Sequence, residues 1–284
     1  MSLRSFVKKL GAGPRFLRGR KSDLPAPPIL REPERFPYGP FRCKTQLLPG
    51  SQYSVLASPN LRTWIPIHQG KAQDGPVEYL DSEAPKFTYR FYRLLTDEVY
   101  SANVIGYASV SLPPGFSIIT NPFDSSATVE DTFKKWPDGT SLNRFDTRLF
   151  RLVENAIKAG KWLAPGEKLL RGEGAIFFNP TSDYKMASFV GEVRQGNLSA
   201  PVPSGFSLRA SLVPQAGNLV EDLGFPIAEG DVIHLFDREQ QKYFLHPYRD
   251  GKWPAGPPVV AVGEAFWVAK SESRNWVQNL IIQS

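Results

Sequence analysis

The sequence predicts an all-β protein: a small β-sandwich module followed by two tandem β-sandwich-like repeat units, behind a basic N-terminal arm. Three observations support this fold class. Short apolar runs are punctuated by 23 glycines and 26 prolines, and aromatic residues make up 12% of the chain. Residue patterns in the last two thirds recur about 90 positions apart. A chain of 284 residues is long enough to bury more than one core.

The basic character of the chain is concentrated in residues 1–21, which contain no acidic residue. The formal net charge is +6, and without this arm the remaining basic residues nearly balance the 28 acidic ones. We expect a disordered or extended, solvated arm. Alternatives are an arm that binds nucleic acid or an anionic membrane, or one that docks on a partner subunit. Its seven basic residues are Arg4, Lys8, Lys9, Arg15, Arg18, Arg20 and Lys21.

Residues 22–40 contain six prolines in nineteen positions. Proline fixes φ and has no N–H, so this segment is predicted to be an extended, semi-rigid linker. A proline-rich peptide for an aromatic groove is the alternative.

Residues 41–98 are predicted to form a small antiparallel sandwich, because apolar runs of four to eight residues alternate with turn signals. The series Tyr53–Ser58, Asn60-Leu61, Trp64, Tyr79–Asp81 and Arg90–Arg93 resembles a compact fibronectin type III-like module. Such modules recur in large bacterial surface and secreted proteins.

The remaining chain is a duplication, with unit 1 at residues 106–195 and unit 2 at residues 196–284. At an offset of 90, Gly106, Ser109, Pro113, Gly115, Phe116 and Ser117 match Gly196, Ser199, Pro203, Gly205, Phe206 and Ser207. At an offset of 91, Gly139, Phe145, Asp146, Gly160, Lys161, Trp162, Gly172 and Glu173 match Gly230, Phe236, Asp237, Gly251, Lys252, Trp253, Gly263 and Glu264. Tryptophans held in register over this distance indicate a true repeat.

Each unit reads as about six short strands. Asp250-Gly251 predicts a hairpin turn of the type I′ kind. The segment 151–159 has helix-forming residues at helical spacing, which favours one helical turn there. We expect two similar lobes packed side by side; one composite sandwich with a shared core is the alternative.

The repeat pattern, clearest in unit 2, is similar to a β-rich C-terminal repeat of uncharacterised bacterial surface and secreted proteins. That resemblance implies non-enzymatic scaffolding, adhesion or assembly at the cell exterior. The sequence shows no apolar stretch of the kind that a signal peptide needs, so the compartment is left open.

The sequence predicts no catalytic residues, no metal site and no cofactor. Gly-x-Ser-x-Gly, phosphate-binding loops and dinucleotide fingerprints are absent. His234 and His246, with Asp237 or Asp250 as a third ligand, form a conceivable metal set, but structural roles are favoured for them. Cys43 is the only cysteine, and no apolar run is long enough for a transmembrane segment.

The candidate binding residues are tryptophans and lysines of the repeat: Trp162, Trp253, Trp267, Lys161 and Lys252. Tryptophans at such positions are expected to be packing anchors, and exposed ones would stack on sugars or form an interface hot spot. A second set comprises the repeat landmarks Gly172, Glu173, Gly263 and Glu264, for which a structural role at a bend is expected.

The favoured function is that of a non-catalytic structural or interaction protein, a β scaffold that assembles with itself or with other protein subunits. The alternatives are a carbohydrate-binding module that uses these tryptophans, and a nucleic-acid or anionic-membrane tether through the N-terminal arm.

Overall fold

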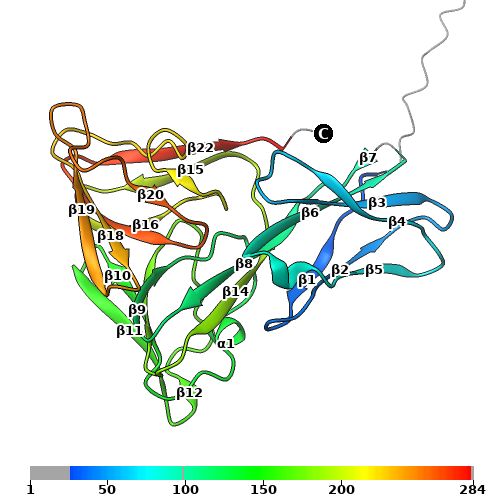
Figure 1. The fold of residues 1–284 in the computed structure, drawn as a ribbon, viewed down its shortest axis with the longest axis horizontal. Helices are drawn as coiled ribbons and strands as arrows, with labels where there is room; N and C mark the ends of the chain where they lie inside the picture. The colour runs from blue at the N-terminus through cyan, green and yellow to red at the C-terminus, as the bar shows by residue number, and fades with distance from the viewer. Residues whose placement is uncertain (1–25, 98, 283–284) are drawn as a thin grey trace, which may run out of the picture.

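The computed structural model describes residues 26–97 and 99–282, which form an antiparallel all-β structure, as predicted (Figure 1). The basic arm at residues 1–21 and the first part of the linker lie outside the described residues. Helical structure in the described part is confined to α1 (Val129–Thr132) and a 3-10 turn at Ala84–Lys86.

The N-terminal part of the described chain is a β-sandwich (Figure 1). The first sheet has three strands in the order β1 (Arg31–Arg35), β2 (Phe41–Gln46), β5 (Pro76–Asp81). The second sheet has the order β14 (Lys185–Glu192), β8 (Ile105–Leu112), β6 (Tyr89–Thr96), β3 (Gln52–Ser58), β4 (Ile65–Lys71). A short strand, β7 (Val99–Tyr100), pairs with β6 beside this sheet. The rings of Phe41 and Tyr92, one from each sheet, stack with centroids 4.3 Å apart. This stack lies in the core between the sheets.

This sandwich uses strands from both sides of the predicted module. β1 lies inside the predicted proline-rich linker and pairs with β2 through a register shift between Arg31 and Glu34, the place where Pro33 stands. A bulge on an edge strand tolerates a residue without an N–H. At the other side, β8 and β14 come from repeat unit 1 and extend the second sheet. The sandwich and the repeat therefore share two strands.

The two repeat units share a four-strand order. The sheet of unit 1 runs β12 (Lys161–Trp162), β11 (Arg151–Lys158), β10 (Ser141–Asp146), β13 (Ala175–Asn179), β9 (Gly115–Ile119); that of unit 2 runs β19 (Lys242–Pro247), β18 (Val232–Asp237), β21 (Ala265–Lys270), β16 (Gly205–Ala210). In these sheets β11-β10-β13-β9 corresponds to β19-β18-β21-β16, and unit 1 adds β12. The first and last strands of each unit pair as β8–β14 and as β15 (Gly196–Val202) with β22 (Arg274–Leu280), and unit 2 adds the pair β17 (Gly217–Asn218) and β20 (Val259–Val260). The sequence repeat is thus also a repeat of topology.

The segment 151–159 is not helical, so that prediction was wrong. Residues 151–158 form β11, which pairs with β10 over residues 151–156 and with β12 at Ile157 and Lys158, and Ala156 and Ile157 are buried. Sheet pairing and burial outweigh the small differences in intrinsic helix propensity.

The turn at Asp250-Gly251 is the predicted one, and unit 1 has an equivalent turn at Ala159-Gly160 that was not predicted. Ala159 and Gly160 have φ values of +52° and +74°, and Asp250 and Gly251 have +53° and +69°. Positive φ at both central residues defines a type I′ turn.

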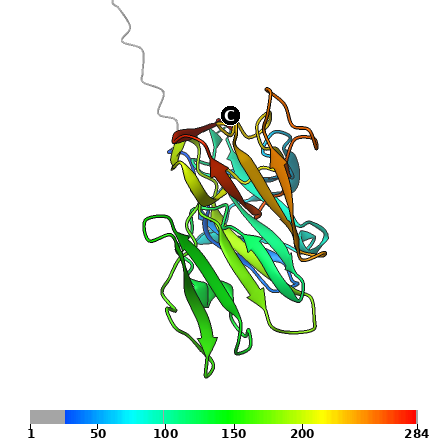
Figure 2. The same cartoon turned by 90° about the vertical axis from the view of Figure 1, so that its left-hand side faces the viewer.

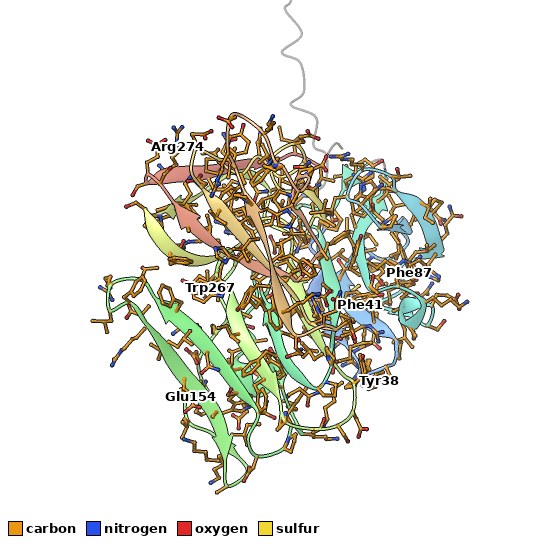
Figure 3. All side chains as sticks on the ribbon, turned by 60° about the vertical axis from the view of Figure 1, so that its left-hand side comes forward. Tyr38, Phe41, Phe87, Glu154, Trp267 and Arg274 are labelled. Atoms are coloured by element: carbon orange, nitrogen blue, oxygen red, sulfur yellow. The ribbon has the colours of Figure 1, made fainter. Side chains whose placement is uncertain are left out.

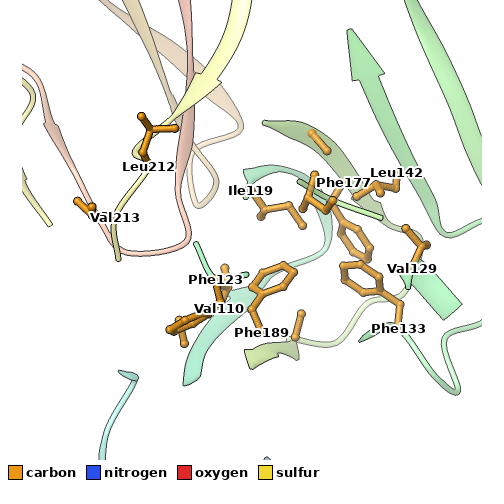
Figure 4. Close-up of a cluster of buried hydrophobic side chains, with 14 of the residues drawn as sticks. Val110, Ile119, Phe123, Val129, Phe133, Leu142, Phe177, Phe189, Leu212 and Val213 are labelled. Carbon is orange, nitrogen blue, oxygen red and sulfur yellow. The ribbon is translucent and has the colours of Figure 1, made fainter. Parts of the chain in front are cut away.

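The main core of unit 1 gathers Val129, Phe133, Leu142, Phe177 and Phe189 beneath its sheet (Figure 4). The same cluster includes four residues of unit 2, namely Leu198, Leu212, Val213 and Leu280. Unit 2 has a separate cluster of its own, which includes Trp276. The units are therefore neither independent lobes nor one sandwich: each has a core, and the first core extends into the second unit.

A reciprocal backbone contact joins the two units. The N–H of Thr120 donates to the C=O of Gly263 at 3.0 Å, and the N–H of Ala210 donates to the C=O of Gly172 at 3.2 Å. Thr120 and Ala210 are equivalent by the offset of 90, and the two glycines by the offset of 91. The units are therefore related by a pseudo-two-fold arrangement, with Ile118, Leu208 and Ala265 buried between them.

We predict that Gly263→Ala destabilises the inter-unit contact. Gly263 has a φ of +84°, and a Cβ there would lie 2.6 Å from Val110 Cγ2. Backbone strain alone costs about 1–2 kcal/mol, and the clash adds to it. Gly251→Ala is the matched control, since Gly251 has a φ of +69° and nothing within 4 Å of its Cβ position. Urea unfolding that shows equal losses for the two variants would contradict the packing role.

A fully buried ion pair distinguishes the core of unit 2. Lys270 Nζ bonds to Asp231 and to the C=O of Pro226, and Asp231 Oδ1 accepts from Ser271 N at 2.7 Å. The equivalent residues of unit 1 are the uncharged Asn179 and Thr140, which are also buried. The same fold position thus holds an ion pair in one unit and neutral polar groups in the other.

We predict that Lys270→Met destabilises the protein by about 3–5 kcal/mol, because it leaves the Asp231 carboxylate buried without its cation. The double variant Asp231→Thr/Lys270→Asn, which copies unit 1, is expected to lose clearly less. Denaturant midpoints of the three proteins test this. A double variant less stable than Lys270→Met would show that the neutral pair is incompatible with unit 2.

Candidate functional site

An open groove lies between the two repeat units, with a volume of about 450 Å³. We call it the aromatic groove. It is lined by Phe145, Phe150, Phe206, His234, Tyr243 and Trp267. Phe145 and Phe150 belong to the β10–β11 hairpin of unit 1, and the other four belong to the sheet of unit 2. The β10–β11 hairpin of unit 1 and the β18–β19 hairpin of unit 2 both lie on the side of the molecule that faces the viewer in Figure 2.

The floor of the aromatic groove is an aromatic contact across the two units. The ring of Trp267 on β21 meets that of Phe145 on β10 edge-on, with centroids 4.8 Å apart. Figure 3 shows Trp267 between the green strands of unit 1 and the orange strands of unit 2. Both residues also pack against the buried residues between the units. The groove is therefore a continuation of the inter-unit interface to the surface.

The walls of the aromatic groove are large side chains left partly exposed. Phe150 is 67% exposed, and Phe206 and Tyr243 are each 42% exposed. Phe206 packs edge-on against His234 at 5.5 Å between ring centroids. Phe150 meets Phe145 at 5.3 Å.

Exposed apolar side chains also stand on the groove face of the two hairpins. Leu152 is 50% exposed and pairs with Phe145, and Leu245 is 54% exposed and pairs with His234. Leu149, in the turn of the β10–β11 hairpin, is 59% exposed. Exposed apolar residues grouped in this way are typical of an interaction surface.

The pseudo-symmetric counterpart of the groove is closed by Gln241, which stands where unit 1 has Phe150. Its Oε1 accepts from the N–H of Phe116 at 2.8 Å, and its Nε2 donates to the C=O of Phe116 at 2.9 Å. The Phe116 ring packs on Phe178, 4.8 Å between centroids. Unit 2 has Ala269 at the position of Phe178, so the Phe206 ring packs against His234 instead. Four substitutions between the copies, at Phe150, Trp267, Tyr243 and His234, thus make one site aromatic and open.

The β18–β19 hairpin is also tied to unit 1 beyond Gln241. Arg238 Nη1 donates to the C=O of Ser111 at 2.9 Å, and the Tyr184 hydroxyl donates to Glu239 at 2.6 Å. The β10–β11 hairpin has no hydrogen bond of this kind to unit 2 among the described residues. One hairpin tip is anchored, and the tip with Leu149 and Phe150 projects.

The predicted tryptophans occupy three different environments. Trp162 is 6% exposed and belongs to the core of unit 1. Trp253 is partly buried and packs against Tyr248 at 5.0 Å. Trp267 lines the aromatic groove. Lys161 and Lys252 are exposed beside their turns.

Glu173 and Glu264 occupy equivalent recesses beside the inter-unit contact. Glu264 accepts from Ala261 N at 2.9 Å and lies 3.7 Å from Arg238, and burial raises its pKa. Glu173 lies 3.6 Å from Arg144, and backbone bridges pair Glu173 with Arg209 and Glu264 with Ile119. Both carboxylates stand at the bend where one unit meets the other, next to Gly172 and Gly263.

The histidines of unit 2 are not brought together with acidic groups as a metal set. His234 faces the aromatic groove, and His246 Nδ1 lies 3.1 Å from the C=O of Gly256. Within residues 26–97 and 99–282, no group of three His, Cys, Asp or Glu side chains has the arrangement of a metal site. No helix in that part of the chain has the length and apolarity to cross a membrane.

Sequence reasoning identified Trp267 but missed Phe145, Phe150, Phe206 and Tyr243 as parts of one site. The available signal was the difference between the repeats rather than their likeness. Phe150 against Gln241, and Ala269 against Phe178, mark where the two copies diverge.

No protein-family model matches the chain, and no curated protein matches it. Among solved structures, the tetra-tandem repeat in the extending region of a large adhesion protein is matched at 9% identity. That match covers 90% of this chain and 74% of the other, with a TM-score of 0.23. A TM-score at this level does not establish a shared fold.

We predict that His234 makes the protein less stable as the pH falls from 7.5 to 5.5. Burial among aromatic rings lowers the pKa of His234 below its ordinary value near 6.5. The unfolded chain therefore takes up the proton first, and the stability present at pH 7.5 is lost as the pH falls through that value. His234→Asn, which copies Asn143 of unit 1, is expected to flatten this part of the profile. Urea unfolding at both pH values that shows the same slope for the two proteins would contradict this role.

Proposed function

We propose that this chain is a non-catalytic interaction protein whose binding surface is the aromatic groove, and that its partner is a protein. The observation that carries this is the asymmetry of the duplication. Gln241 closes one copy of the site, whereas the other copy is open and lined by six aromatic side chains. Trp and Tyr in partly buried positions are the side chains that most often dominate binding energy at protein interfaces.

In this proposal the rest of the chain acts as a scaffold that holds the aromatic groove. We propose that the N-terminal sandwich is a fibronectin type III-like module, since its two facing antiparallel sheets have the architecture that such modules share. Assembly at the cell exterior, which the resemblance implies, belongs to the same proposal.

A protein partner fits the groove better than a glycan does. Sugar binding needs an accessible aromatic face with polar groups beside it, whereas the Trp267 ring is partly covered by Phe145. The exposed side chains of Leu149, Leu152 and Leu245 extend the apolar surface instead. For these reasons the carbohydrate alternative is second.

We predict that a photo-reactive amino acid at Leu149 crosslinks the partner in cells, and that Phe150→Ser/Tyr243→Ser reduces the adduct roughly tenfold by removing the groove walls. Phe150 is 67% exposed and Tyr243 is 42% exposed, so folding should be little affected. The same amino acid at Leu163, which directly follows β12 and is 55% exposed, is the matched control. Light scattering shows whether the partner is a second copy.

An adduct unchanged by the double variant would contradict the groove as the binding surface. Binding on a glycan array that depends on Trp267 would favour the carbohydrate alternative instead.

A further inference from the structure

We propose that the aromatic groove receives an extended peptide segment of the partner, which adds to the free edge of β16 through main-chain hydrogen bonds at Phe206. This rests on the proposed function, because it specifies how the partner is held. Strand addition of this kind combines main-chain bonds for affinity with a side-chain pocket for specificity.

The edge of β16 is free at Phe206. β16 is the outermost strand of its sheet, and Phe206 pairs with Ala269 in the register that Phe116 has with Phe178 in unit 1. In that register the N–H and C=O of Phe116 point away from the sheet, since Gln241 binds both. The same groups of Phe206 therefore also point outward. Within the described residues, no side chain hydrogen-bonds to either group.

Gln241 shows what an occupant of this edge looks like. Its carboxamide offers one C=O to the N–H of Phe116 and one N–H to the C=O of Phe116, at 2.8 and 2.9 Å. A main-chain peptide group carries the same acceptor and donor. Phe150, at the position of Gln241, carries neither, so these two groups of Phe206 are left to water or to a polypeptide from outside the chain.

The apolar groove explains which peptide is held. Phe206 lies at the wall of the groove, with Trp267 and Phe145 at its floor. A strand paired with β16 at Phe206 would direct alternate side chains to one face. An aromatic or aliphatic side chain at such a position enters the groove, which is continuous with the packed interface between the units.

The test uses the full-length chain and a phage-displayed library of random linear peptides. We expect selected peptides to be rich in aromatic or aliphatic residues at a fixed position. Phe206→Ala removes the ring and keeps the N–H, whereas Phe206→Pro removes both; an edge strand tolerates proline at an outward-facing N–H. Selected peptides should bind Phe206→Pro roughly tenfold more weakly than Phe206→Ala, on the scale of one lost hydrogen bond.

A second variant tests the same idea without proline. Phe150→Gln places a carboxamide where Gln241 stands in the other copy, and Phe150 has the φ that Gln241 has, +50° against +51°. This variant should close the edge, slow hydrogen exchange at the Phe206 amide and abolish peptide binding. In the unaltered protein, the Phe206 amide should exchange faster than the Phe116 amide.

The proposal is overturned if the selected peptides bind Phe206→Pro and Phe206→Ala equally and are indifferent to Phe150→Gln. It is also overturned if the library yields no peptide that depends on the groove. In either case, partner crosslinking at Leu149 that depends on Phe150 and Tyr243 would leave the proposed function standing, with a folded surface as the ligand.

Discussion

The reciprocal hydrogen bonds at Gly172 and Gly263 constrain the arrangement of the two repeat units. Each bond requires a backbone carbonyl of one unit to approach a strand of the other closely, and a side chain at either glycine would meet Leu212 or Val110 at 2.6 Å. With this contact fixed, each hairpin tip is brought to the edge strand of the opposite unit. The closed site at Phe116 and the open site at Phe206 both follow from it.

A second constraint is the sharing of strands between domains. The sheet that contains β6, β8 and β14 has one face in the core with Phe41 and Tyr92, and it sends Val110 and Phe189 into the core of unit 1. A sheet that is covered on both sides has no solvent-exposed face, and its strands lack clean polar alternation. The sandwich and the repeat are therefore joined by a shared sheet rather than by a linker.

The sequence was sufficient for the fold class, the duplication and the type I′ turn at Asp250-Gly251, because each depends on local chemistry or on rare residues held in register. It was insufficient where pairing with a distant strand determines the secondary structure of a segment. Arg31–Arg35 was predicted to be linker because it lies in a segment with six prolines, and a bulge accommodates Pro33. Residues 151–158 looked helical because pairing with β10 is not visible in their own composition. The groove was missed for a related reason: Phe145 and Phe206 are 61 positions apart, and the contact between units brings them together.

The carboxamide of Gln241 has a consequence for stoichiometry. A chain with phenylalanine at both position 150 and position 241 would present two open edges, and such a molecule can bridge two partners and build a network. With Gln241 bound to Phe116, the chain itself occupies one of these edges. On the proposed function, each molecule is then monovalent at this surface. It ends or decorates an assembly instead of branching it.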